Sequence, residues 1–251
     1  MRGELKFLQA QNHLGTLRGV VAAYQAQVAD ALVVVTTAED GGVEYRRGDV
    51  PAPPAEIGLA LGDFLQAARA SLDHAVYAIS TATASTPIGT GFPLCLTKSE
   101  YRTQAARQLR HVPEEVRRLV EQLQPFTDGA GAADPLWQLH HLAVIDRHRE
   151  ITLLAAVVAT LDVGWTRTDP SDDDPDIRFY VPAVAAGELV LRLPSPEQEP
   201  TARFDPNFEL TVVIGEGGRR DVRPEVWGLA SEIRGRVWTV LGQLDRAADP
   251  A

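Results

Sequence analysis

Three side chains that could carry chemistry, Arg69, Asp73 and His74, fall within the alanine-rich stretch "QAARASLDHAVYAIS", residues 66–80. The stretch has helical periodicity, and burying a charge is costly unless the charge is paired. Arg69 and Asp73 are four residues apart, so they are neighbours on a helix and can form an ion pair. His74 lies roughly 140° around the helix from Arg69 and needs a partner on another element. The cluster therefore indicates either a structural network or a functional site.

A second polar cluster occupies "PLWQLHHLAVIDRHRE", residues 135–150. Asp146 continues the apolar face of a predicted helix, so we expect its carboxylate to point inward. A buried carboxylate needs a cationic or hydrogen-bonding partner. Arg69 is the first candidate for that partner, His74 is the second, and Arg149 is the local one.

The two clusters together predict one composite site. Two sets of polar residues at positions that demand burial are best explained by mutual contact. We therefore expect Arg69 or His74 to lie within hydrogen-bond distance of Asp146 or of residues 146–149. The candidate catalytic residues are Arg69 and His74, and the candidate supporting residues are Asp73, Asp146, His148, Arg149 and His141.

Each of these residues also has a purely structural interpretation. Arg69, Asp73 and Asp146 could form a buried ion network that fastens two helices. His74 could be a core histidine bonded to a backbone carbonyl. A metal site shared by Asp73 and the histidines of both clusters would lack the close i, i+4 histidine pair of a zinc-binding helix. We therefore expect no metal ion and no cofactor.

Hydrophobic periodicity predicts the elements that must position these residues. Helices are expected over residues 7–28, 57–79, 98–109, 113–124, 134–146 and 226–244. Strands are expected on both sides of a turn at residues 39–42, in residues 150–165, and in the runs "IRFYVPA", "ELVLRLP" and "FELTVVIGE". Residues 150–163 could also form a helix, but their β-branched side chains favour a strand. The pattern predicts an α+β chain, a helical bundle with a small antiparallel β-sheet and a C-terminal helix.

The composition sets the outer limits of size and compartment. With 251 residues, of which 45% are hydrophobic, the chain can bury a sizeable core. We expect residues 1–165 to form a mainly helical domain with an inserted hairpin. Residues 166–251 are expected to form a β-rich segment with a closing C-terminal helix, packed on the first as one unit. The single cysteine, Cys95, excludes an internal disulfide framework, so we expect a cytoplasmic protein.

The net charge and the apolar runs limit the partners. A formal net charge of −10 disfavours sequence-independent adhesion to nucleic acid or to an anionic membrane. No apolar run is long enough and free enough of charge to span a bilayer. We therefore expect no membrane partner.

The clusters resemble those of an uncharacterised family of bacterial proteins with R-x-x-L-D-H and I-D-[KR]-H-R motifs. The counterparts in this chain are "AARASLDH", "FPL" at residues 92–94, "QPF" at residues 124–126 and "LHHLAVIDRHR". The resemblance covers roughly residues 56–150. It carries no reaction with it.

Arg69 and His74 also have an R-x4-H spacing, which is similar to the R-x4-6-H motif of HEPN proteins. These are helical bundles that often dimerise and include metal-independent ribonucleases. The resemblance assigns Arg69 to stabilising the phosphate and His74 to proton transfer at the ribose 2′-oxygen or the leaving group. Ala70 departs from the polar residue usual after the arginine.

Two functions from different classes follow. The HEPN resemblance implies a metal-independent ribonuclease or RNA-binding protein acting as a homodimer, and if the chain is an enzyme we expect a ribonuclease. The competing hypothesis is a non-catalytic interaction or structural protein that binds a partner protein. In that case the Arg/Asp/His cluster is a buried network, and losing one member would leave an unpaired charge.

Overall fold

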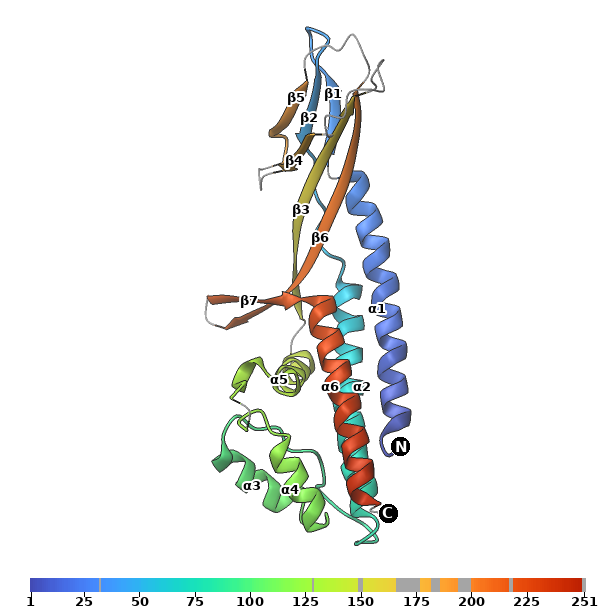
Figure 1. Cartoon of the computed structure of the whole chain (residues 1–251), viewed down its shortest axis with the longest axis vertical. Helices are drawn as coiled ribbons and strands as arrows, with labels where there is room; N and C mark the ends of the chain where they lie inside the picture. The colour runs from blue at the N-terminus through green and yellow to red at the C-terminus, as the bar shows by residue number, and fades with distance from the viewer. Residues whose placement is uncertain are drawn as a thin grey trace, which may run out of the picture.

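Six α-helices and seven strands make up the described part of the chain (Figure 1). The computed structural model describes residues 1–31, 33–127, 129–148, 151–165, 177–181, 186–193, 200–216 and 219–249. The helices are α1 (Glu4–Ala31), α2 (Ala55–Ser80), α3 (Lys98–Gln108), α4 (Glu114–Gln122), α5 (Pro135–His148) and α6 (Val226–Ala248), with a 3-10 turn η1 (Gly131–Ala133) before α5. The strands are β1 (Val33–Thr37), β2 (Val43–Arg47), β3 (Thr152–Trp165), β4 (Ile177–Val181), β5 (Leu189–Leu193), β6 (Pro200–Glu216) and β7 (Arg219–Glu225). The α+β class predicted from the sequence is confirmed.

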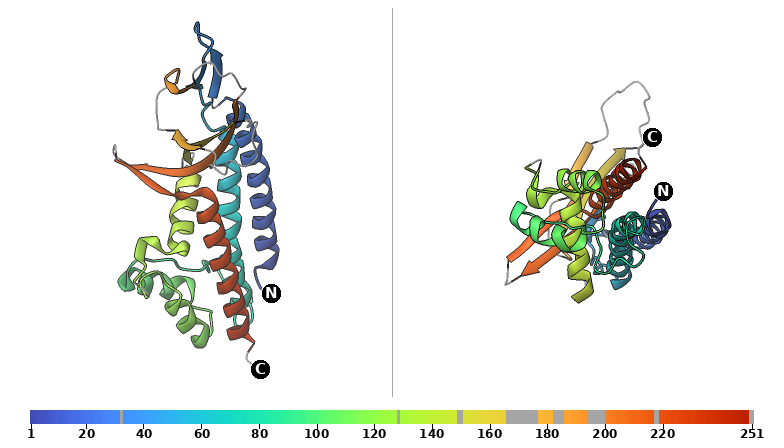
Figure 2. Two further views of the ribbon diagram at one scale, coloured as in Figure 1. Left: turned by 45° about the horizontal axis from the view of Figure 1, so that its top comes forward. Right: turned by 90° about the horizontal axis from the view of Figure 1, so that it is seen from below.

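Three long helices, α1, α2 and α6, form the body of the molecule (Figure 1). Helix α2 packs against α1 on one side and against α5 and α6 on the other. The view from below in Figure 2 shows α3, α4 and α5 grouped away from α1. The strands lie at one end of this bundle, and both chain termini lie at the other end (Figure 1). The candidate polar residues lie in the second half of α2, towards the end of the bundle that carries the termini (Figure 1).

The apolar stripes predicted for the long helices form one core. On α2 the side chains of Leu61, Phe64 and Leu72 are fully buried. On α1 the stripe from Phe7 to Val28 is buried in the same cluster. Burying such side chains removes apolar surface from water, which is the main driving force for packing the helices together.

Asp134 and Pro135 define the start of α5. The Oδ1 atom of Asp134 accepts hydrogen bonds from the backbone N–H groups of Leu136 (2.7 Å) and Trp137 (3.4 Å). Pro135 occupies the first helical position, where its missing N–H costs nothing. These two residues set where α5 begins and therefore which of its side chains face α2.

The strands form two antiparallel sheets, with the orders β1-β2-β5 and β4-β3-β6-β7. The hairpin predicted around residues 39–42 is present, and Gly41 in its turn has a φ of 81°. Residues 152–165 form β3, a strand as expected. Strand β7 was not predicted, because its sequence "RRDVRPE" has no apolar alternation.

Strand pairing joins the two predicted segments of the chain. β5, in the segment 166–251, pairs with β2 of the first segment. β3 pairs with β6 along its whole length, from Thr152 opposite Val213 to Trp165 opposite Pro200. Helix α6 packs on α2 and α5. The segments 1–165 and 166–251 thus share both sheets and the helical core.

Candidate functional site

The Arg69–Asp73 pair is bonded to a loop of the same chain. Arg69 Nη1 donates to Asp73 Oδ1 (2.8 Å), and Arg69 Nη2 donates to the backbone oxygen of Phe92 (2.6 Å). The backbone N–H of Phe92 donates in turn to Asp73 Oδ1 (2.8 Å). Only 12% of the Arg69 side chain is exposed. The ion pair of α2 therefore binds both the N–H and the oxygen of the Phe92 backbone. We refer to residues 91–95 as the 91–95 loop.

Gln124 holds the same loop from the other side. Its side chain is fully buried after the end of α4. Its Nε2 atom donates to the backbone oxygens of Pro93 (2.9 Å) and Val120 (3.0 Å), and its Oε1 atom accepts from the N–H of Cys95 (3.1 Å). The "FPL" and "QPF" motifs thus meet at one point of the fold. Sequence reasoning noted both motifs but attached no contact to them.

Asp146 meets α2 one turn away from Arg69. Gln66 Nε2 donates to Asp146 Oδ2 (3.0 Å) and to the backbone oxygen of Ala143 (2.6 Å). The Asp146 carboxylate lies directly against Gly62, where a Cβ atom would have no room. One turn earlier, a Cβ at Gly58 would lie 3.0 Å from the backbone oxygen of Ile151. Glycines on α2 therefore let the end of α5 approach closely.

The expected bond from Arg69 or His74 to Asp146 is wrong within the described residues. Asp146 takes its hydrogen bond from Gln66, and the Arg69 guanidinium is engaged elsewhere. The two helices do pack together as predicted. The close contact of Asp146 with Gly62 sets the position along α2 at which α5 crosses it. At that position Gln66 is the α2 side chain that reaches Asp146. Helical periodicity alone does not determine this position.

His74 is exposed, so the interpretation as a core histidine is wrong. The reason lies at the start of α1. Gly3, with a φ of 80°, packs directly on the backbone oxygen of Ser71. Because α1 begins at Glu4, the last turns of α2 extend past it and the face bearing His74 has no cover from α1.

The remaining predicted supporting residues are spread along α5. His141 is half-buried, and its ring stacks on that of Trp137 with centroids 6.2 Å apart. His148 is exposed at the end of the helix. Arg149 lies outside the described residues. Of the supporting residues that the structure describes, only Asp73 bonds directly to a candidate catalytic residue.

His140, which the sequence analysis did not select, links the two clusters electrostatically. Burial lowers its pKa to about 4, and the nearby guanidinium groups of Arg69 and Arg147 act in the same direction. The carboxylate of Asp73 opposes them. The helical spacing could have identified His140. It lies three positions before Ala143 and seven before Arg147, so the three residues share one face of the helix. The bonded contacts between the two stretches run from Gln66 to Asp146 and from Arg147 to Gln66, and His140 is close enough to Arg69 and Asp73 to feel their charges.

The lowered pKa of His140 predicts an acid-sensitive fold. The folded protein keeps His140 neutral down to about pH 4, whereas the unfolded chain binds a proton near its ordinary pKa of 6.5. Between these values the unfolded state holds more protons, so stability falls as the pH falls. Allowing for the partial exposure of the ring, we expect this residue to contribute a loss of about 1–2 kcal/mol.

The measurement is urea unfolding at pH 7 and at pH 4.5 for the wild-type protein and His140→Gln. We expect the wild-type protein to lose about 1–2 kcal/mol more than the variant over this interval. His74→Gln is the matched control, because His74 is exposed and should follow the wild-type dependence. Equal pH dependence in the wild-type protein and His140→Gln would contradict the assignment.

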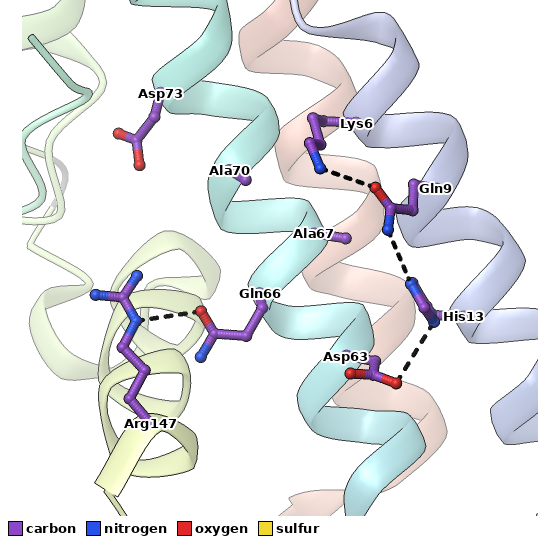
Figure 3. A pocket seen from close by; sticks show the side chains of 9 residues that line it. All are labelled: Lys6, Gln9, His13, Asp63, Gln66, Ala67, Ala70, Asp73 and Arg147. Carbon is purple, nitrogen blue, oxygen red and sulfur yellow. Dashed lines mark hydrogen bonds and ion pairs between the residues drawn. The ribbon is translucent and has the colours of Figure 1, made fainter.

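A cavity of about 370 Å³ lies between α1, α2 and α5 (Figure 3). Ala67 and Ala70 of α2 line its middle, and Asp73 lies at one end. Lys6 of α1 and Arg147 of α5 stand on opposite sides of α2 (Figure 3). The cavity thus adjoins the Arg69–Asp73 pair, which was part of the predicted site.

Hydrogen bonds order the polar side chains along the α1 wall of the cavity (Figure 3). Lys6 Nζ donates to Gln9 Oε1 (3.0 Å), and Gln9 Nε2 lies 3.4 Å from His13 Nε2. Since the Gln9 oxygen faces the ammonium group, its Nε2 is the donor and His13 Nε2 the acceptor. The other ring nitrogen, Nδ1, lies 3.8 Å from Asp63 Oδ2.

The α5 wall carries a cation that is oriented in a similar way. Arg147 Nε donates to Gln66 Oε1 (3.3 Å), and Gln66 in turn donates to Asp146. The guanidinium plane is therefore held from α2 while its two Nη groups make no bond among the described residues. Arg147 and Gln66 are further residues that the sequence analysis missed. Arg147 falls within the quoted motif "IDRHR", so the signal was present.

Comparison with known proteins leaves this site without a precedent. Within the described part of the chain, no group of three or more histidine, cysteine, aspartate or glutamate side chains could hold a metal ion. None of the helices searched there has the length and apolar character needed to cross a membrane. No family model, no curated protein and no solved structure matches the chain.

Proposed function

We propose that the chain is a non-catalytic interaction protein in which the Arg69–Asp73 pair fastens the 91–95 loop to α2. One observation carries this proposal. Both Nη atoms of Arg69 are bonded inside the chain, to Asp73 (2.8 Å) and to the backbone oxygen of Phe92 (2.6 Å). The guanidinium keeps further N–H donors, but only 12% of the side chain is exposed, so little of it is accessible to a phosphate.

The ribonuclease or RNA-binding function is the second candidate, and the exposure of His74 favours it. An exposed imidazole can reach a substrate and is a chemical group suited to proton transfer. The engagement of Arg69 counts against it, because the arginine assigned to the phosphate is not available. Catalysis would require both groups at one reacting centre.

An RNA cleavage assay separates the two functions. We expect a labelled single-stranded RNA to remain as intact with the wild-type protein as in buffer, and equally intact with His74→Ala. His111→Ala is the control, since His111 is a partly exposed histidine outside both polar clusters. Cleavage by the wild-type protein and by His111→Ala that falls at least about 100-fold in His74→Ala would overturn the proposal.

For such an interaction protein we infer that the partner is a second copy of the chain. Support comes from Trp238 on α6, which is 52% exposed although its ring lies 5.2 Å from that of the buried Phe7 on α1. A cavity of about 210 Å³ opens beside these two rings. Exposed aromatic side chains next to packed helices are typical of protein interfaces.

A further inference from the structure

The cavity between α1, α2 and α5 holds two cations without a carboxylate partner. Lys6 and Arg147 are each bonded to an amide oxygen, of Gln9 and Gln66 respectively. Among the described residues neither forms an ion pair. Both side chains therefore keep N–H donors that a ligand could use.

The acidic side chains of the same cavity are already occupied or peripheral. Asp73 is paired with Arg69 at 2.8 Å and also accepts from the N–H of Phe92. The Asp63 side chain is 66% exposed and lies 3.8 Å from the His13 ring. Of the four charged residues that line the cavity, Lys6 and Arg147 are thus the two whose charge has no ionic partner among the described residues.

The shape of the cavity fits a small molecule. Its volume of about 370 Å³ falls within the range of about 300–1,000 Å³ typical of small-molecule sites. Ala67 and Ala70 leave its middle open because their side chains end at Cβ. Arg147 is held through Nε, so its Nη groups are oriented to bind two oxygens of one anionic group.

We propose that this cavity binds a small organic anion whose carboxylate or phosphate groups contact Lys6 on one side and Arg147 on the other. The Lys6 ammonium group contributes a compact charge from α1, and the Arg147 guanidinium contributes a planar pair of donors from α5. Because the two residues lie on opposite sides of α2, a bound anion would bridge α1 and α5 across it (Figure 3). This inference goes beyond the proposed function and does not depend on it.

Calorimetric titrations with inorganic phosphate, with succinate and with a single-stranded RNA oligonucleotide test the proposal. We expect at least one of the two small anions to bind with a Kd of about 1 mM or tighter. The one that binds identifies the anionic group. Lys6→Gln and Arg147→Gln should each weaken that binding about tenfold or more, because each removes a charge-assisted contact.

Two further variants separate a built site from general charge attraction. Ala70→Leu should abolish binding by filling the cavity without changing its charge. Arg118→Gln is the matched control, because Arg118 is an exposed arginine paired with Glu114 on α4, and it should leave the Kd unchanged. Circular dichroism on each variant verifies that the fold is retained.

Three results would overturn the proposal. The first is the absence of binding by either small anion up to about 10 mM. The second is an equal loss of affinity in Arg118→Gln and Arg147→Gln. The third is binding of the RNA alone, dependent on Lys6 and Arg147, which would assign the cavity to nucleic acid. RNA cleavage is read out separately, so failure here is distinguishable from failure of the proposed function.

Discussion

Replacing Gln124 with leucine should lower the free energy of unfolding by about 3–5 kcal/mol, the largest single effect that we expect in this protein. The side chain is fully buried and makes three hydrogen bonds to backbone groups. Leucine would leave the N–H of Cys95 and the oxygen of Pro93 without these partners. A buried polar group that loses its partner costs about 1–3 kcal/mol. Urea unfolding monitored by circular dichroism measures the loss.

A matched control for this variant lies two residues away. Gln122→Leu introduces the same side chain at an exposed position, and we expect a change within about 0.5 kcal/mol. Comparable losses in the two variants would mean that leucine is poorly tolerated throughout this segment. The hydrogen bonds of Gln124 would then not be the cause.

Replacing Arg69 with methionine should lower the free energy of unfolding by about 2–4 kcal/mol. The methionine retains the apolar stem but removes both donors, so Asp73 loses its counter-ion and the oxygen of Phe92 loses its hydrogen bond. A partly buried carboxylate without a counter-ion is destabilising. The measurement is again the midpoint and slope of urea unfolding at pH 7.

A double-mutant cycle with Asp73→Asn tests whether the two residues act as a pair. If they do, the double variant should lose less stability than the two single losses added together. Arg118→Met is the comparison for an exposed pair, and it should cost less than about 1 kcal/mol because water screens its contact with Glu114. Additive losses in the cycle would rule out direct coupling.

The parts of this structure that sequence could predict are those set by local spacing. The apolar stripe of α2, the Asp134 cap of α5 and the Arg69–Asp73 pair all follow from residues within one or two helical turns of each other. What Arg69 binds beyond Asp73 could not be predicted. Its second partner is the backbone oxygen of Phe92, and backbone oxygens are present at every residue, so they leave no pattern in the sequence.

The position along α2 at which α5 crosses it could also not be predicted from the sequence. Asp146 was correctly expected to need a partner, but which side chain of α2 it meets depends on the axial position of α5. Contact with Gly62 sets that position, and a glycine within a helix does not identify its neighbour. The choice of Gln66 over Arg69 is thus a tertiary property. The lowered pKa of His140 is likewise a tertiary property, because it comes first from burial and then from the neighbouring guanidinium groups of Arg69 and Arg147.

The glycine face of α2 also controls the direction in which the sheets leave the helices. Gly58 and Gly62 contact the chain at Ile151 and Asp146, directly before β3 begins at Thr152. β3 has 14 residues and so reaches about 45 Å at about 3.3 Å per residue. A rotation of β3 by about 5° at its first residue would therefore displace its far end by about 4 Å. The close contacts at Gly58 and Gly62 thus influence where the distal strands lie.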